Sequence, residues 1–94
     1  MQVVWTEPAR LARASAIDYI AQDSPTAALN QLDEIEKQTD RLAEHPKLWR
    51  LGRVKGTREL VIARTPFLAV YRIQGELVQI LRFLHGAQQW PPSK

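Results

Sequence analysis

The sequence contains no cysteine, and this absence excludes several classes of protein. Without thiols the chain has no disulfide framework, no thiolate metal ligand and no cysteine nucleophile, and it fits a reducing compartment. Long apolar runs are also missing, since no stretch approaches the roughly 18 residues that a membrane helix needs. The first residues lack the basic segment and apolar run of a signal peptide. We therefore expect a cytoplasmic protein that makes no membrane contact.

Glycine is scarce, with four residues in the chain, and none of them forms a phosphate-binding loop pattern. Histidine is scarcer, with two residues, and neither lies at ligand spacing from carboxylates. The sequence therefore predicts no metal and no cofactor.

What is present is an ordinary globular composition, with 45% hydrophobic and 24% charged residues in 94. A chain of this length buries about two-thirds of its unfolded surface, enough for one two-layer core. We therefore expect a single domain over residues 1–94.

Charge is unevenly distributed along the chain. The net charge is +3, which permits an acidic partner without requiring nucleic acid. Residues 23–46 are mainly acidic. Residues 47–64 are mainly basic and contain one acid, Glu59. The densest basic cluster consists of Arg50, Arg53, Lys55 and Arg58.

Periodicity and turn residues predict the order β-α-α-β-β-β. The expected elements are a strand at 2–5, a helix to about 21, a helix from 25 to about 44, a basic loop at 47–56, and strands at 57–64, 67–73 and 77–84. Thr6 and Ser24 are the expected helix caps. The short link between the helices predicts an antiparallel hairpin. The fold class is therefore α+β, an antiparallel sheet with an N-terminal helical hairpin packed on one face. The tail at 87–92 is expected to be extended.

Several segments, in this order and spacing, are similar to those of the ParE/RelE toxin family. They are Ser24-Pro25-Thr26-Ala27-Ala28, Leu42-Ala43-Glu44-His45-Pro46, Gly52-Arg53-Val54, Gly56-Thr57-Arg58-Glu59-Leu60, Val70-Tyr71-Arg72-Ile73 and the final run from Val78 to His85. The resemblance implies the toxin of a type II toxin–antitoxin module, which inhibits growth until an antitoxin silences it.

The family divides by target. RelE-like members resemble ribonucleases that cut messenger RNA on the ribosome, and ParE-like members resemble non-enzymatic poisons of DNA gyrase. Three differences from the RelE pattern favour the ParE branch: Leu68 and Gln88 stand where basic residues are expected, and no tyrosine follows Tyr71. If the chain were a ribonuclease, the catalytic candidates would be His85, Arg82 and Arg58, as base and phosphate-binding cations.

Each candidate also has a structural interpretation. His85 could end a strand and bond a loop carbonyl. Arg72 and Arg82 could form ion pairs with Glu59 or Glu76, or contact a target. Trp90 could pin the tail on the sheet or anchor a partner. The candidate surface for target or antitoxin consists of Arg50, Arg53, Lys55, Arg58, Arg72, Arg82 and Trp90.

The partners that the resemblance implies are a ParD-like antitoxin with an acidic tail and, as target, gyrase or the ribosome. An acidic tail and a basic toxin would associate fast. Two antitoxins bridging two toxins, a heterotetramer, is the arrangement that the family implies. A DNA-binding protein is disfavoured because neither helix has a basic face.

Overall fold

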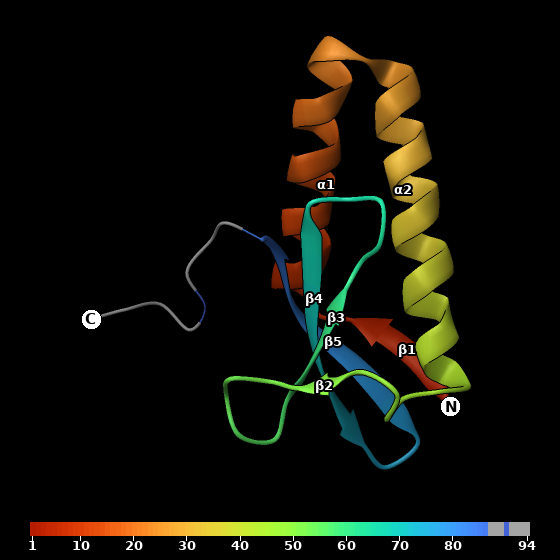
Figure 1. The fold of residues 1–94 in the computed structure, drawn as a ribbon, viewed down its shortest axis with the longest axis vertical. Helices are drawn as coiled ribbons and strands as arrows, with labels where there is room; N and C mark the ends of the chain where they lie inside the picture. The colour runs from red at the N-terminus through yellow and green to blue at the C-terminus, as the bar shows by residue number, and fades with distance from the viewer. Residues whose placement is uncertain (87–89, 91–94) are drawn as a thin grey trace.

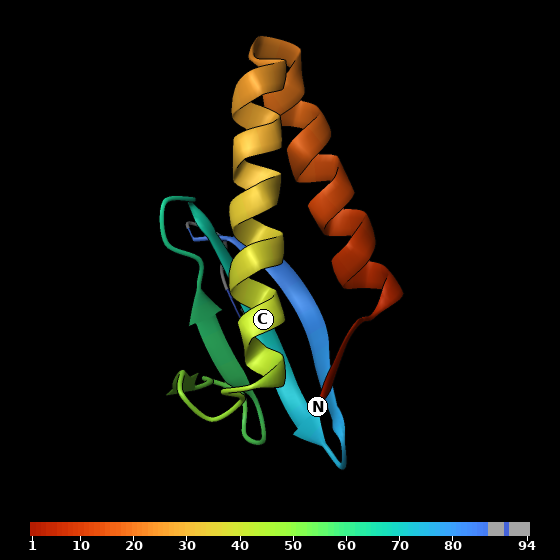
Figure 2. The same ribbon diagram turned by 90° about the vertical axis from the view of Figure 1, so that its right-hand side faces the viewer.

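The computed structural model describes residues 1–86 and residue 90. Its elements are β1 (Gln2–Trp5), α1 (Glu7–Asp23), α2 (Pro25–Asp40), a 3-10 turn η1 (Arg41–Ala43), β2 (Arg50–Leu51), β3 (Arg58–Val61), β4 (Phe67–Gln74) and β5 (Leu77–His85). The two helices form a hairpin that lies on one face of the sheet and extends beyond the ends of the strands (Figures 1 and 2). The predicted α+β architecture is confirmed, while the extended tail predicted at 87–92 lies, apart from Trp90, outside the described residues.

The sheet has five strands in the order β1-β5-β4-β3-β2. The last three strands form the predicted antiparallel meander, but β1 pairs parallel with β5, from Gln2 opposite Leu77 to Trp5 opposite Ile80. The sheet is therefore mixed, and the prediction that it is antiparallel throughout is wrong at β1. Turn residues fix the direction of strands that are consecutive in sequence, and β1 has no such neighbour.

A second correction concerns the basic loop at 47–56. Arg50 and Leu51 form the short edge strand β2, which pairs with Glu59 and Arg58 of β3. The sequence pattern gave no sign of this strand because two residues are too few to show alternation.

The helix starts differ in their chemistry. Ser24 caps α2 as predicted, since its hydroxyl accepts a hydrogen bond from the backbone N–H of Ala27 at 3.1 Å. Thr6 stands at the N-cap of α1, but its hydroxyl donates to the carbonyls of Ile80 and Leu81 instead. Its side chain therefore ties the start of α1 to β5, so Thr6 occupies the predicted N-cap position but makes no side-chain cap hydrogen bond.

The core lies between the hairpin and the sheet. α2 supplies Ala28, Ile35 and Thr39 and η1 supplies Leu42, all of them buried. From the sheet come the alternate residues of each strand, among them Leu60, Phe67, Ala69, Tyr71, Val78, Ile80 and Phe83. Residues at the intervening positions lie on the far face of the sheet, opposite the helices.

A β-bulge decides which side chains of β5 reach each face. Val70 pairs with Arg82 and Tyr71 pairs with Ile80, so Leu81 is the extra residue. Without it, strict alternation from Ile80 would direct Arg82 into the core. With it, Phe83 is buried and Arg82 is exposed on the far face.

The loop between β3 and β4 is held against α2. The buried Gln38 amide donates to the Ala63 carbonyl at 2.9 Å and accepts from the Ala63 N–H at 2.8 Å. Next to it, Arg64 donates twice to Glu34, at 2.7 and 3.0 Å. The hydrogen bond from Arg64, and then that from Gln38, lower the pKa of Glu34 from 4.5 to about 2.

Candidate binding surfaces

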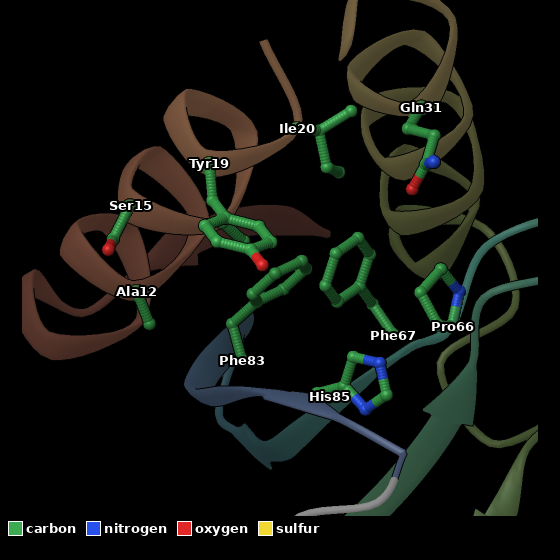
Figure 3. Close-up of a pocket in the computed structure, with 10 residues that line it drawn as sticks. Ala12, Ser15, Tyr19, Ile20, Gln31, Pro66, Phe67, Phe83 and His85 are labelled. Atoms are coloured by element: carbon green, nitrogen blue, oxygen red, sulfur yellow. The ribbon is translucent and has the colours of Figure 1, made fainter. Parts of the chain in front are cut away.

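His85 lies on the helical face of the sheet, at the end of β5. It pairs with Phe67 across the ladder, and its ring meets the Phe67 ring edge-on with the centroids 6.0 Å apart. It also lines a pocket of about 530 Å³ under the hairpin, together with Tyr19, Ile20 and Phe83 (Figure 3). His85 is thus an exposed residue at the rim of this pocket, in contact with the Phe67 ring.

Arg72 and Arg82 lie on the far face. Arg72 donates to the side-chain oxygen of Gln79 at 2.7 Å, and Arg82 donates to the carbonyl of Leu81 at 3.0 Å. Arg82 also lies over the ring of the partly buried Trp90, 5.8 Å from its centroid. The alternative in which these arginines form ion pairs with Glu59 or Glu76 is therefore wrong, because neighbouring polar atoms and an aromatic ring receive them instead.

Arg58 is separated from the other cations of its cluster. It donates to the carbonyls of Trp49 at 2.8 Å and Lys47 at 3.2 Å, which holds the chain between η1 and β2. It pairs with Tyr71 in the ladder, and its charge opposes the effect of burial, which raises the pKa of the Tyr71 hydroxyl. That hydroxyl donates to the carbonyl of Pro46 at 2.6 Å. Lys55 is exposed in the turn between β2 and β3.

The three candidate catalytic residues are not brought together. His85 and Arg58 share the helical face but stand opposite Phe67 and Tyr71 of β4, four residues apart and therefore roughly 13 Å along the strand. Arg82 lies on the far face, separated from both by the sheet. No single phosphate group can contact all three side chains in this arrangement.

The sequence suggested Glu59 only as a partner for Arg72 or Arg82, whereas the structure pairs it with Arg50 and Arg53, at the centre of the basic segment. Its side chain is 1% exposed. It accepts hydrogen bonds from Arg50 Nη2 at 3.0 Å, from the Arg53 backbone N–H at 3.0 Å, and from Arg53 Nε and Nη2 at 3.2 and 3.3 Å. Burial raises the pKa of Glu59, but the hydrogen bonds from Arg53 and Arg50 outweigh it and the net shift is downward. The sequence signal for this pairing was that Glu59 is the one acidic residue among the basic residues of 47–64.

These two arginines border a hollow of about 670 Å³ on the far face, which we call the far-face hollow. Its other walls include Leu51, Val61 and Leu68. Leu68 is 5% exposed, whereas Val61 and Leu51 are 52% and 74% exposed. The hollow therefore combines cations with accessible apolar surface.

The pocket under the hairpin has a different character. Its walls are mostly apolar, and the Gln31 side-chain oxygen on its α2 side is buried without a hydrogen-bond partner (Figure 3).

Two kinds of feature are absent from the part of the chain that the structure describes. Within residues 1–86 and Trp90, no group of three or more His, Asp or Glu side chains is arranged to hold an ion. Over the same residues, no helix combines the length and apolar character needed to cross a bilayer.

Comparison with known proteins gives consistent results. Residues 3–90 match the family model described as "ParE toxin of type II toxin-antitoxin system, parDE". The chain is 47% identical over 73 residues to a protein of Sinorhizobium fredii described as "Putative toxin Y4kP", covering 78% of this chain and 75% of that protein. It is also similar to a solved chain of the chromosomal ParDE system from P. aeruginosa, with a TM-score of 0.80 and 31% identity over 90% of this chain and 95% of that chain.

Proposed function

This chain belongs to the ParE toxin family of type II toxin–antitoxin systems, and from that premise we propose that it acts in the cytoplasm by binding and inhibiting DNA gyrase. It is the toxin component of its module, and the family implies an antitoxin partner. Gyrase is the target that the ParE branch favours, and the action we propose is binding without catalysis.

The arrangement of the candidate catalytic residues carries this proposal. Cutting RNA requires a base and cations within reach of one phosphate. His85 and Arg58 stand at opposite ends of one face and Arg82 stands on the other. Arg58 is, in addition, engaged by two backbone carbonyls. A poison that acts through its surface needs no such constellation.

We propose that the antitoxin is ParD-like and that two antitoxins bridge two toxins. The pocket under the hairpin supports an apolar contact, since its walls include Ile20, Phe67 and Phe83. The remaining candidate residues, Lys55, Arg72, Arg82 and Trp90, support contact with acidic or polar groups of the antitoxin or the target. Basic and apolar surfaces on different faces suit a partner that wraps around the toxin.

The test is a supercoiling reaction with purified gyrase, relaxed plasmid and ATP. Added toxin is expected to suppress supercoiling and to accumulate cleaved DNA, and the cognate antitoxin is expected to restore activity. His85→Ala should inhibit gyrase as the parent does, because the proposal gives His85 no chemical role. Undisturbed supercoiling together with cleavage of ribosome-bound message would assign the chain to the ribonuclease branch instead.

A further inference from the structure

Glu59 makes the basic segment a fixed surface. A carboxylate with 1% exposure is retained in a fold only if its charge is compensated, and here two guanidinium groups and one backbone N–H compensate it. The same contacts hold both arginines in set orientations on the far face. Two positive charges against one negative charge leave the cluster with a net charge of +1.

The arginines keep binding capacity toward solvent. The side chain of Arg50 is 59% exposed and that of Arg53 is 50% exposed. A guanidinium has five N–H donors, and Glu59 accepts one from Arg50 and two from Arg53. Donors therefore remain for a second carboxylate, and their orientation is already fixed before a ligand arrives.

Apolar surface lies directly beside these donors. Val61 and Leu68 pair with each other in the ladder and both line the far-face hollow. Val61 and Leu51 are each more than half exposed, although both are large apolar side chains. A ligand that fits here offers an apolar group to Val61 and an acidic group to the arginines.

We propose that the far-face hollow binds an acidic protein segment in which an apolar side chain adjoins a carboxylate, and that Glu59 is the positioning residue of this site. A nucleic acid fits less well, because its affinity depends on a series of phosphate contacts and the hollow offers two cations with a carboxylate between them. The proposal concerns this surface and does not depend on gyrase being the target.

The test is a titration of the isotope-labelled full chain, followed by backbone and arginine Nε–H resonances. The probe is a short peptide in which leucine and glutamate alternate. The proposal predicts shifts at Arg50, Arg53 and Val61. A peptide with glutamine in place of glutamate should bind about tenfold more weakly, since it loses the charge-assisted hydrogen bonds to the arginines. Shifts confined to the pocket under the hairpin, or tighter binding of a single-stranded DNA probe at the hollow, would overturn the proposal.

Three arginine variants distinguish binding at the far-face hollow from a general effect of the protein's positive charge. Arg50→Ala and Arg53→Ala are each expected to weaken peptide binding about tenfold. Arg10→Ala is the matched control, because Arg10 is an exposed arginine on α1 that pairs with Glu7. It should bind as the parent does. Equal affinities for all three variants would refute the site.

The positioning role of Glu59 is tested with Glu59→Gln, measured well below its unfolding temperature so that the variant is folded. We expect weaker peptide binding and a broadened Arg53 Nε–H resonance, with partial rescue of both by Glu59→Asp. If Glu59→Gln stays folded and binds the peptide with the parent affinity, Glu59 has no positioning role.

Discussion

Glu34 illustrates how a single side chain can hold a loop in one conformation. The β3–β4 loop includes Arg64, whose backbone adopts a positive φ of 65°, a conformation that few residues other than glycine adopt. Two hydrogen bonds from its guanidinium to Glu34, and the Gln38 amide on Ala63, hold this conformation against α2. The loop therefore depends on polar contacts with a helix about 30 residues earlier.

This contact predicts a pH dependence of stability. Because the folded-state pKa of Glu34 is lowered from 4.5 to about 2, its stabilising effect is complete above pH 4.5 and is lost as the pH falls toward 2. In urea unfolding, Glu34→Gln should be less stable than the parent at pH 7, and the difference should narrow by pH 3. The control Glu36→Gln, exposed on the same helix, should change stability little at either pH. If the difference in stability between Glu34→Gln and the parent is the same at pH 3 as at pH 7, the lowered pKa of Glu34 is contradicted.

The partners of individual side chains could not be predicted from the sequence. Arg82 was correctly named as a cation on a sheet strand, but its partners are Leu81 and Trp90 because the bulge at Leu81 turns it to the far face. The role of Glu59 depends on contacts with residues six and nine positions away across a turn. Periodicity reports which face a residue occupies and carries no information about such pairings.

At the scale of elements, Gly52 sets where β2 can lie. Its N–H donates to the Thr57 carbonyl at 2.7 Å, which closes the turn that leads from β2 to β3. A Cβ at this position would overlap Thr57 Oγ1 and approach the Thr57 carbonyl carbon to 3.1 Å. Thr57 is buried, so it cannot move aside without disturbing the turn.

Gly52→Ala is therefore expected to lower the free energy of unfolding by about 1–3 kcal/mol. Gly75→Asn is the matched control, because φ at Gly75 is +58°, a value asparagine tolerates, and nothing lies within 4 Å of a Cβ there. Urea denaturation of both variants is the measurement. Equal stability of Gly52→Ala and the parent would mean that the turn accommodates the methyl group.

Elements were predictable where local chemistry governs them. The Ser24 cap, the second helix and the two strands on either side of Gly75 are signals carried by neighbouring residues, and each prediction is confirmed. The strand β2 and the direction of β1 depend on distant partners, Glu59 for the first and β5 for the second. Sequence reasoning missed both for that reason.

At the scale of the whole molecule, β1 closes one edge of the sheet. Its residues Val3 and Trp5 pack on the core, and Trp5 also stacks with Arg13 at 4.2 Å. Without β1, the long strand β5 would expose unpaired backbone groups along its outer edge, and such edges promote association.

Deletion of residues 1–5 is accordingly expected to lower the unfolding temperature and to produce concentration-dependent oligomers. Size-exclusion chromatography with light scattering over a range of concentrations measures the second effect. Gln2→Lys, a change at an exposed position of the same strand, should leave the protein in its parent state of association. A deleted chain that matches the parent in both measurements would show that β1 does not protect the edge.

The parallel pairing of β1 with β5 also has a consequence for synthesis. Trp5 meets Ile80, so the first strand has no partner until 75 further residues have been translated. At about 5–20 residues per second, the ribosome needs about 4–15 s to supply them. During that interval the nascent chain lacks β5, the strand that joins β1 to the rest of the sheet.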